Sequence, residues 1–309
     1  MTEIEVRALY EGQLIRTIEA SGAEAVEAVL ATAWGLFRDR DAWLPSAARA
    51  LVLRETARRM QEQAADLTRE GGKPLVDSRV EVARAIDGVL HCAELLRSES
   101  GKVVPMGLNG ASTGRIAFTQ HEPIGVVVAV SAFNHPLNLI VHQVAPAIAA
   151  GCPVIVKPAT DTPLFCLRFF SILHEAGLPP GWCQALVVAS RALSQQLVTD
   201  PRVGFFSFIV SAAVGWSLRS SLTPGMRCAL EHGAAAPVLV LRRIQKMQVA
   251  SGCGLLPIGA ISAACIFRLR RCTSARILQQ TLVSAVLGAI GARTSCEFEA
   301  AKSKLVTFR

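Results

Sequence analysis

One stretch of the sequence, residues 123–158, constrains the fold more than any other. It reads PIGVVVAVSAFNHPLNLIVHQVAPAIAAGCPVIVKP. A β-rich run ends in a turn that carries Ser131 and Asn134, an apolar stretch of helical character follows, and a second β-rich run ends at Lys157. Strand, turn, helix and strand make one βαβ unit. Its polar residues lie at the carboxyl ends of the strands, where open α/β sheets bind ligands.

The alternation of strands and helices continues along the chain. Residues 23–70 and 78–99 have helical patterns, residues 1–22 are weakly patterned, and 114–120 read as an extended segment. The pattern then predicts strands over 124–131, 153–157, 184–188, 203–208 and 226–230, and helices near 137–149, 162–176, 191–198 and 212–222. Ser190 and Ser211 are predicted helix caps. Repeated β–α alternation indicates an α/β fold with a parallel five-stranded sheet covered on both faces.

The opening stretch resembles the cofactor-binding core of the aldehyde dehydrogenase superfamily. Residues 133–136 match the family's P-[WF]-N-x-P motif, and residues 151–158 match G-N-x-V-[VI]-x-K-P at the same spacing. The resemblance runs from about residue 38 to 241. It implies a Rossmann-like NAD(P)-binding domain over residues 1–241, with N-terminal helices, and the oxidation of an aldehyde to a carboxylic acid with NAD or NADP.

The resemblance assigns a role to several residues of the βαβ unit. Asn134 would donate a hydrogen bond to the developing oxyanion, although Asn-His-Pro also suits an ordinary turn. Ser131 and Phe133 would line the cofactor site. Lys157 would reach the adenosine ribose, where the alternative is a solvated lysine at a strand end. Thr160 replaces the Glu of many NAD-preferring members, so no carboxylate would repel a 2′-phosphate there, and the choice between NAD and NADP stays open.

A second motif begins at Phe206, in the run FSFIVSAAVG. It resembles the family's F-[TS]-G-S-x-x-x-G turn, which brings the backbone and a helix N-terminus to the pyrophosphate. Ser211 and Gly215 match, and both are predicted to bind the cofactor. Val210 replaces the first Gly, and a β-branched residue cannot easily take that place. We therefore expect phosphate binding to be weakened.

The general base and the nucleophile complete the set of catalytic residues that the resemblance implies. Glu231, in ALEHGAAAP, matches the Glu that activates the deacylating water. The family's nucleophile is a Cys, and Cys265 lies at the family's distance from Glu231. Its neighbours do not match, since Ser262-Ala263-Ala264 replaces Gly-Gln-x. Cys265 is the candidate nucleophile, and a chance match in a chain with nine cysteines is the alternative.

The last part of the chain, residues 242–309, has a different composition. It holds 11 Lys or Arg and two acids, a net charge of +9, whereas residues 1–241 carry −1. It is rich in Arg, Leu, Cys and Ser, and it lacks the family's acidic segment after Leu241. We predict a basic tail that is an incomplete or degenerate catalytic region, read out of frame or decayed. Family members continue well beyond this length, so we expect a truncated member with impaired activity.

Composition and charge leave two further hypotheses. The first is a catalytically inactive fragment that keeps part of a nucleotide pocket. The second is a nucleic-acid-binding protein with a basic tail, which we do not expect because the tail has few aromatic residues and no recognised module. Scattered cysteines without CxxC, and no resemblance to a signal peptide, predict a cytoplasmic protein that makes no membrane contact and has no metal site. The predicted partner is a small aldehyde. The resemblance also implies a homo-oligomer, in which residues 101–122 contribute to packing and other interface elements are missing here.

Overall fold

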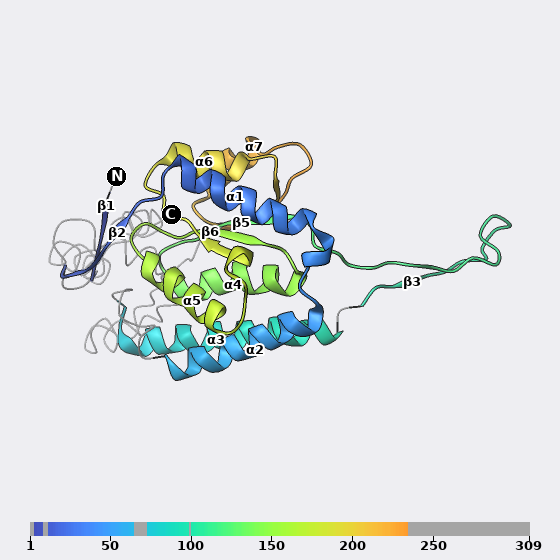
Figure 1. The fold of residues 1–309 in the computed structure, drawn as a ribbon, viewed down its shortest axis with the longest axis horizontal. Coiled ribbons are helices and arrows are strands. Elements are labelled where there is room, and N and C mark those ends of the chain that lie inside the picture. The colour runs from blue at the N-terminus through green and yellow to red at the C-terminus, as the bar shows by residue number, and fades with distance from the viewer. Residues whose placement is uncertain (1–2, 9–11, 65–72, 99, 234–309) are drawn as a thin grey trace, which may run out of the picture. The chain divides into compact units, whose positions relative to one another are not determined.

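The computed structural model describes residues 3–8, 12–64, 73–98 and 100–233. A five-stranded parallel sheet forms the centre of this part of the chain (Figure 1). The strand order is β7–β6–β5–β8–β9, and every pairing is parallel. The strands are β5 (Val126–Val130), β6 (Val154–Lys157), β7 (Cys183–Ala185), β8 (Val203–Val210) and β9 (Arg227–His232). This confirms the predicted α/β fold with a Rossmann-like sheet. The predicted tail, residues 242–309, and Cys265 lie outside the described residues.

Helices cover both faces of the sheet (Figure 1). One face is covered by α1 (Ala23–Arg38), α6 (Arg191–Thr199) and α7 (Ala212–Ser220), and the other by α4 (Pro136–Ala150) and α5 (Pro163–Glu175). Two further helices, α2 (Ser46–Glu62) and α3 (Leu75–Ser98), pack against α4 and α5. Short 3₁₀ turns, η1 (Arg40–Ala42) and η3 (Pro180–Trp182), join α1 to α2 and α5 to β7.

The central strand β5 shows why this sequence forms a buried parallel sheet. Its run VVVAV is buried over its first four residues, and successive side chains point to opposite faces. Val127 and Ala129 join the core beneath α4 and α5, whereas Val126 and Val128 join the core beneath α1 and α6. A strand that supplies both cores must be apolar throughout, which is the pattern of a strand covered on both sides.

Helix α4 follows β5 and is capped by residues from other parts of the chain. Pro136 occupies its first turn, and Gly151 ends it at a φ of +78° with an N–H bonded to the carbonyls of Ala147 and Ile148. The Arg49 guanidinium from α2 donates to the Ala149 carbonyl and, over 2.8 Å, to Ser46 Oγ. A positive charge at this end complements the helix dipole.

The N-terminal region contains one feature that the sequence pattern did not predict. Residues 1–22 were expected to be weakly patterned, but they hold an antiparallel hairpin of β1 (Glu3–Arg7) and β2 (Leu14–Glu19). Further on, β3 (Val103–Val104) pairs with β4 (Ala117–Phe118) in a narrow ribbon that extends away from the helices (Figure 1). The predicted extended segment, 114–120, contains β4.

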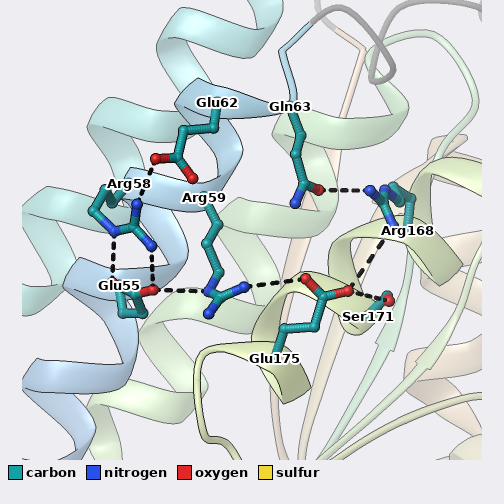
Figure 2. A network of polar contacts seen from close by, with 8 residues as sticks. All are labelled: Glu55, Arg58, Arg59, Glu62, Gln63, Arg168, Ser171 and Glu175. Atoms are coloured by element: carbon teal, nitrogen blue, oxygen red, sulfur yellow. Dashed lines mark hydrogen bonds and ion pairs between the residues drawn. The ribbon is translucent and has the colours of Figure 1, made fainter.

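A network of polar side chains joins α2 to α5 (Figure 2). Glu55 accepts hydrogen bonds from Arg58 Nη2 at 2.6 Å and Arg59 Nε at 2.8 Å. Arg59 continues to Glu175 on α5 over 3.3 Å. On the same face, Arg168 of α5 donates to Gln63 at the end of α2 over 2.7 Å. The network therefore links two helices that also share an apolar contact in the core.

We expect the network to make stability depend on pH in the acid range. Hydrogen bonding from Arg58, joined by Arg59 and opposed by partial burial, lowers the pKa of Glu55 from 4.5 to about 2. A carboxyl group whose pKa is lowered by folding adds stability at pH values above its ordinary pKa. That stability is lost as the pH falls through the pKa of the folded state. Glu55→Gln should therefore lower the free energy of unfolding at neutral pH, and its difference from the wild type should vanish below about pH 2. Urea unfolding at a series of pH values measures this. Glu94→Gln, at an exposed position of α3, is the control, and a difference that did not change with pH would contradict the prediction.

Candidate functional site

The strand order places one topological switch point at the carboxyl end of β5. The chain goes from β5 to β6 and β7 on one side, and then crosses to β8 and β9 on the other. In such sheets ligands bind outside the carboxyl ends of the strands where the order reverses. Ser131, Lys157 and Ser211 follow or end the three central strands. The predicted residues of the described chain are therefore gathered at one edge of the sheet.

The turn after β5 contains two side-chain oxygens that have no hydrogen-bond partner among the described residues. Ser131 is buried, and its N–H donates to the Lys157 carbonyl over 3.2 Å. Within the described residues, neither Ser131 Oγ nor Asn134 Oδ1 has a hydrogen-bond partner. Asn134 and Phe133 are half-buried. Buried polar atoms in folded proteins are almost always hydrogen-bonded, so these two oxygens mark a place that fits a polar ligand or water.

Lys157 ends β6 next to this turn. It is half-buried, and burial lowers the pKa of its ammonium, while the charge of Asp161 acts in the opposite direction. Thr160 lies in the turn between β6 and α5 and is also half-buried. The Lys157 ammonium can donate hydrogen bonds to hydroxyl or phosphate oxygens, and position 160 carries no carboxylate.

The turn from β8 to α7 is tight. Strand β8 ends at Val210 and α7 begins at Ala212, so Ser211 alone joins them as the N-cap residue. The predicted cap position is correct, but the Ser211 side chain makes no capping hydrogen bond. Ser190, by contrast, does cap α6 by accepting from the Leu193 N–H. Ser211 Oγ and the N–H groups of the first turn of α7 are therefore placed to bind an anion.

Gly215 lies in α7 where there is no room for a side chain. A Cβ atom built on it would lie 2.5 Å from His232 Cε1 and 3.1 Å from Phe208 Cδ1. The His232 ring also packs against Trp216, with 5.8 Å between ring centroids. Gly215 thus lets α7 lie close to β8 and β9. This close packing fixes the position of the N-terminus of α7.

Glu231 differs from the expectation in one respect. We expected it to follow an apolar strand, but it lies inside β9, which alternates between exposed and half-buried residues. Its register partner on β8 is Ile209, and the neighbouring pair is His232 with Val210. Glu231 is exposed in the part of the chain that the structure describes. It lies toward the same carboxyl edge as the other predicted residues.

The sequence pattern missed a buried group of charged residues at the start of α4. Lys73 forms an ion pair with Glu81 of α3, and Lys73 Nζ lies 3.1 Å from Nδ1 of His135, the residue after Asn134. Glu81 Oε1 also accepts from the N–H groups of Leu137 and Asn138. The sequence did contain one signal for this group. Glu81 falls on the buried face of α3, and a buried carboxylate needs a charged or hydrogen-bonding partner.

Two surface hollows lie away from this edge. Their volumes are about 470 and 340 Å³, and they lie near the amino ends of β8 and β9, around Thr223, Met226 and Arg227. Neither is lined by a predicted site residue. Among the described residues, no three His, Cys, Asp or Glu side chains are grouped to hold a metal ion. The strand topology and the unpaired polar atoms therefore define the candidate site.

Comparison with known proteins decides the family. The model of the "Aldehyde dehydrogenase family" matches residues 1–280. This chain belongs to the aldehyde dehydrogenase family. The match includes Asn134, Lys157 and Glu231. It extends to residue 280 and is therefore longer than the predicted resemblance, which ends at about residue 241.

Relatives of this aldehyde dehydrogenase chain have about twice its matched length. It is 31% identical over 262 residues to an aldehyde-dehydrogenase-like protein of Sinorhizobium fredii (strain NBRC 101917 / NGR234), covering 82% of this chain and 50% of that protein. The structure is similar to glyceraldehyde-3-phosphate dehydrogenase GapN from Methanocaldococcus jannaschii complexed with NADP, with a TM-score of 0.69, 29% identity, and 76% and 51% of the two chains covered. It also resembles an NAD-dependent benzaldehyde dehydrogenase from Corynebacterium glutamicum, with a TM-score of 0.70, 25% identity, and 76% and 52% covered. The chain thus spans about half the length of these relatives.

No helix among the described residues of this family member is both long and apolar enough to span a membrane.

Proposed function

We propose that this chain is the dinucleotide-binding part of an NAD(P)-dependent enzyme that oxidises an aldehyde to a carboxylic acid. The observation that carries the proposal is the parallel sheet whose switch point presents Asn134 and Lys157 at one carboxyl edge. Family membership supports the reaction class. The division into residues 1–241 and a separate region 242–309 is part of the same proposal, as is a cytoplasmic location.

The proposed chemistry uses three residues of this chain. The Cys265 thiolate attacks the aldehyde carbon, and the carbonyl oxygen becomes an oxyanion that the Asn134 amide stabilises by donating a hydrogen bond. When bound, NAD or NADP supplies the acceptor for the hydride. Glu231 then takes a proton from the water that releases the acid from the sulfur. The exposed position of Glu231 at the carboxyl edge of the sheet gives water access to its carboxylate.

The proposed cofactor contacts come from all three central strands. Lys157 would bind a ribose hydroxyl, and Thr160 leaves room for the 2′-phosphate of NADP, so either dinucleotide fits. Ser131 and Phe133 would line the site after β5. Ser211 and the close packing at Gly215 would bring the N-terminus of α7 to the pyrophosphate.

One observation favours the second candidate, an inactive nucleotide-binding fragment. Val210, where the family motif has Gly, is the last residue of β8, and 37% of its surface is exposed at the turn into α7. A branched side chain there fills space that a pyrophosphate would need. Weak nucleotide binding without turnover would be the result.

Titration with NAD and with NADP tests the proposed function. The four tryptophans report binding, and Trp216 on α7 is the nearest reporter to Ser211 and Gly215. We expect saturable quenching by at least one dinucleotide, and NAD(P)H formation with short aliphatic aldehydes. Cys265→Ser should abolish turnover but leave nucleotide binding unchanged, whereas Cys272→Ser should have no effect on either. Binding without turnover in the wild type would favour the inactive fragment, and no binding of either dinucleotide would contradict both candidates.

A further inference from the structure

Lys73 and Glu81 form a buried ion pair beside the turn that carries Asn134. The side chain of Glu81 is 4% exposed and that of Lys73 is 11% exposed. Moving a charge out of water costs free energy. Removing one partner of a buried ion pair therefore strongly destabilises the protein, because the other charge stays buried without compensation. Lys73 Nζ also lies 3.1 Å from His135 Nδ1. Since an ammonium group has only hydrogens to donate, the His135 nitrogen accepts this bond.

Glu81 supplies the N-terminal cap that α4 lacks in its own sequence. Its Oε1 accepts from the N–H of Leu137 at 2.9 Å and of Asn138 at 3.1 Å. The cap residue, His135, makes no side-chain capping bond, and the first turn of α4 contains no acid. A carboxylate at this end satisfies two N–H groups that have no acceptor within the helix, and it interacts favourably with the helix dipole.

The other end of the turn is held by backbone and amide contacts. Gln143 Nε2 donates to the Val130 carbonyl at 3.2 Å and to Ser207 Oγ at 3.0 Å, which ties the end of β5 to α4 and β8. The Ser131 N–H donates to the Lys157 carbonyl. The turn is therefore fixed before residue 132 and after residue 134. Asn134 Oδ1 has no partner among the described residues. The side-chain oxygen therefore does not fix the turn, and the contacts on either side of Asn134 hold its backbone in place.

We propose that Glu81 and Lys73 are positioning residues, which fix the turn of Asn134 so that its amide meets the substrate oxygen in one orientation. Glu81 acts on the residues after Asn134 through the α4 amides, and Lys73 acts through the His135 ring. The catalytic part of this statement rests on the proposed function, whereas the ordering of the turn does not. Positioning of this kind contributes to catalysis because a preorganised donor needs no reorientation during the reaction.

The charge state of the pair agrees with this role. Burial alone would raise the pKa of Glu81, but its surroundings, which include Lys73 and the N–H of Asn138, lower the pKa more, so the carboxylate stays ionised at neutral pH. Burial lowers the pKa of the Lys73 ammonium, and the charges of Glu81 and Asp77 oppose that effect.

Hydrogen–deuterium exchange of the full chain tests the ordering of the turn. Glu81→Ala removes the cap, and the amides of Leu137 and Asn138 should exchange about 10- to 100-fold faster, as expected for the loss of bonds to a charged acceptor. A peptide covering β8 should exchange as in the wild type, which shows that the fold is retained. Glu81→Gln keeps an acceptor but leaves Lys73 unpaired, so it should give a smaller increase. Glu94→Gln on the same helix is the matched control.

A charge swap separates capping from simple ion pairing. In the Lys73→Glu/Glu81→Lys double variant an ion pair can still form, but a cation now faces the N-terminus of α4. Fast exchange at Leu137 and Asn138 should therefore persist. Protection restored to the wild-type level by the swap, or unchanged protection in Glu81→Ala, would overturn the proposal.

Turnover measurements test the catalytic part. Glu81→Gln should lower kcat about tenfold, with the aldehyde KM and nucleotide binding within about twofold of the wild type. In an Asn134→Ala background the same change should have no further effect on kcat, because Glu81 acts through Asn134. Additive losses would overturn the positioning role. Absence of turnover in the wild type would instead count against the proposed function, and the exchange experiment would still decide whether Glu81 and Lys73 order the turn.

Discussion

Asn134→Ala should lower kcat by about 100- to 1000-fold, the usual cost of removing one oxyanion donor. The amide would act on charge that develops during the reaction, so nucleotide binding and the aldehyde KM should change little. Asn134→Asp should be at least as damaging, because a carboxylate of the same shape repels the oxyanion. Steady-state kinetics and nucleotide titration by tryptophan fluorescence measure the two effects separately.

The control for this prediction is Asn109→Ala. Asn109 lies in the exposed ribbon between β3 and β4, where the same loss of an amide should leave kcat unchanged. A kcat for Asn134→Ala within about threefold of the wild type would show that Asn134 only forms the turn.

Phe206→Ala should lower the free energy of unfolding by about 3–5 kcal/mol. Phe206 is fully buried in the middle of β8, where it pairs with Val128 of β5 and Cys228 of β9. Truncating it removes apolar contacts and leaves a cavity between the sheet and α1, α6 and α7. Urea unfolding monitored by fluorescence or circular dichroism gives the value.

The chain offers a matched control for this change as well. Phe118, on β4, is 71% exposed, so Phe118→Ala should alter stability by no more than about 0.5 kcal/mol. Equal losses for the two variants would mean that Phe206 does not belong to a buried core beneath β8.

The sheet could be predicted from sequence because its signals are local. The run VVVAV, the Pro at the start of α4 and the Gly at its end each determine structure within a few residues. The hairpin of β1 and β2 was missed because its signal is short and lies in one strand only. The run EIEVR in β1 alternates polar and apolar residues, but LIRTIE in β2 does not, and Val6 is the one buried residue of the two strands.

Residues of the candidate site could be predicted where their position along the chain is enough to place them. Residues that join the site through a tertiary contact were missed. Asn134 follows β5 and Lys157 ends β6, so their position at the carboxyl edge of the sheet could be inferred from the order of residues along the chain. The contact of Glu81 with Leu137 spans 56 positions, and no local pattern reports such a pairing. For the same reason the sequence placed Ser211 at its cap correctly but could not tell that its hydroxyl makes no bond to α7.

The two capping contacts of α4 have a consequence for the order in which the protein is assembled. The helix carries no acid in its first turn and no base in its last, and it receives Glu81 from α3 and Arg49 from α2. Isolated, a neutral segment of this length is marginal as a helix. Both capping residues precede α4 in the chain, so during synthesis they leave the ribosome first, and we expect the β5–α4–β6 crossover to become stable once α2 and α3 have paired.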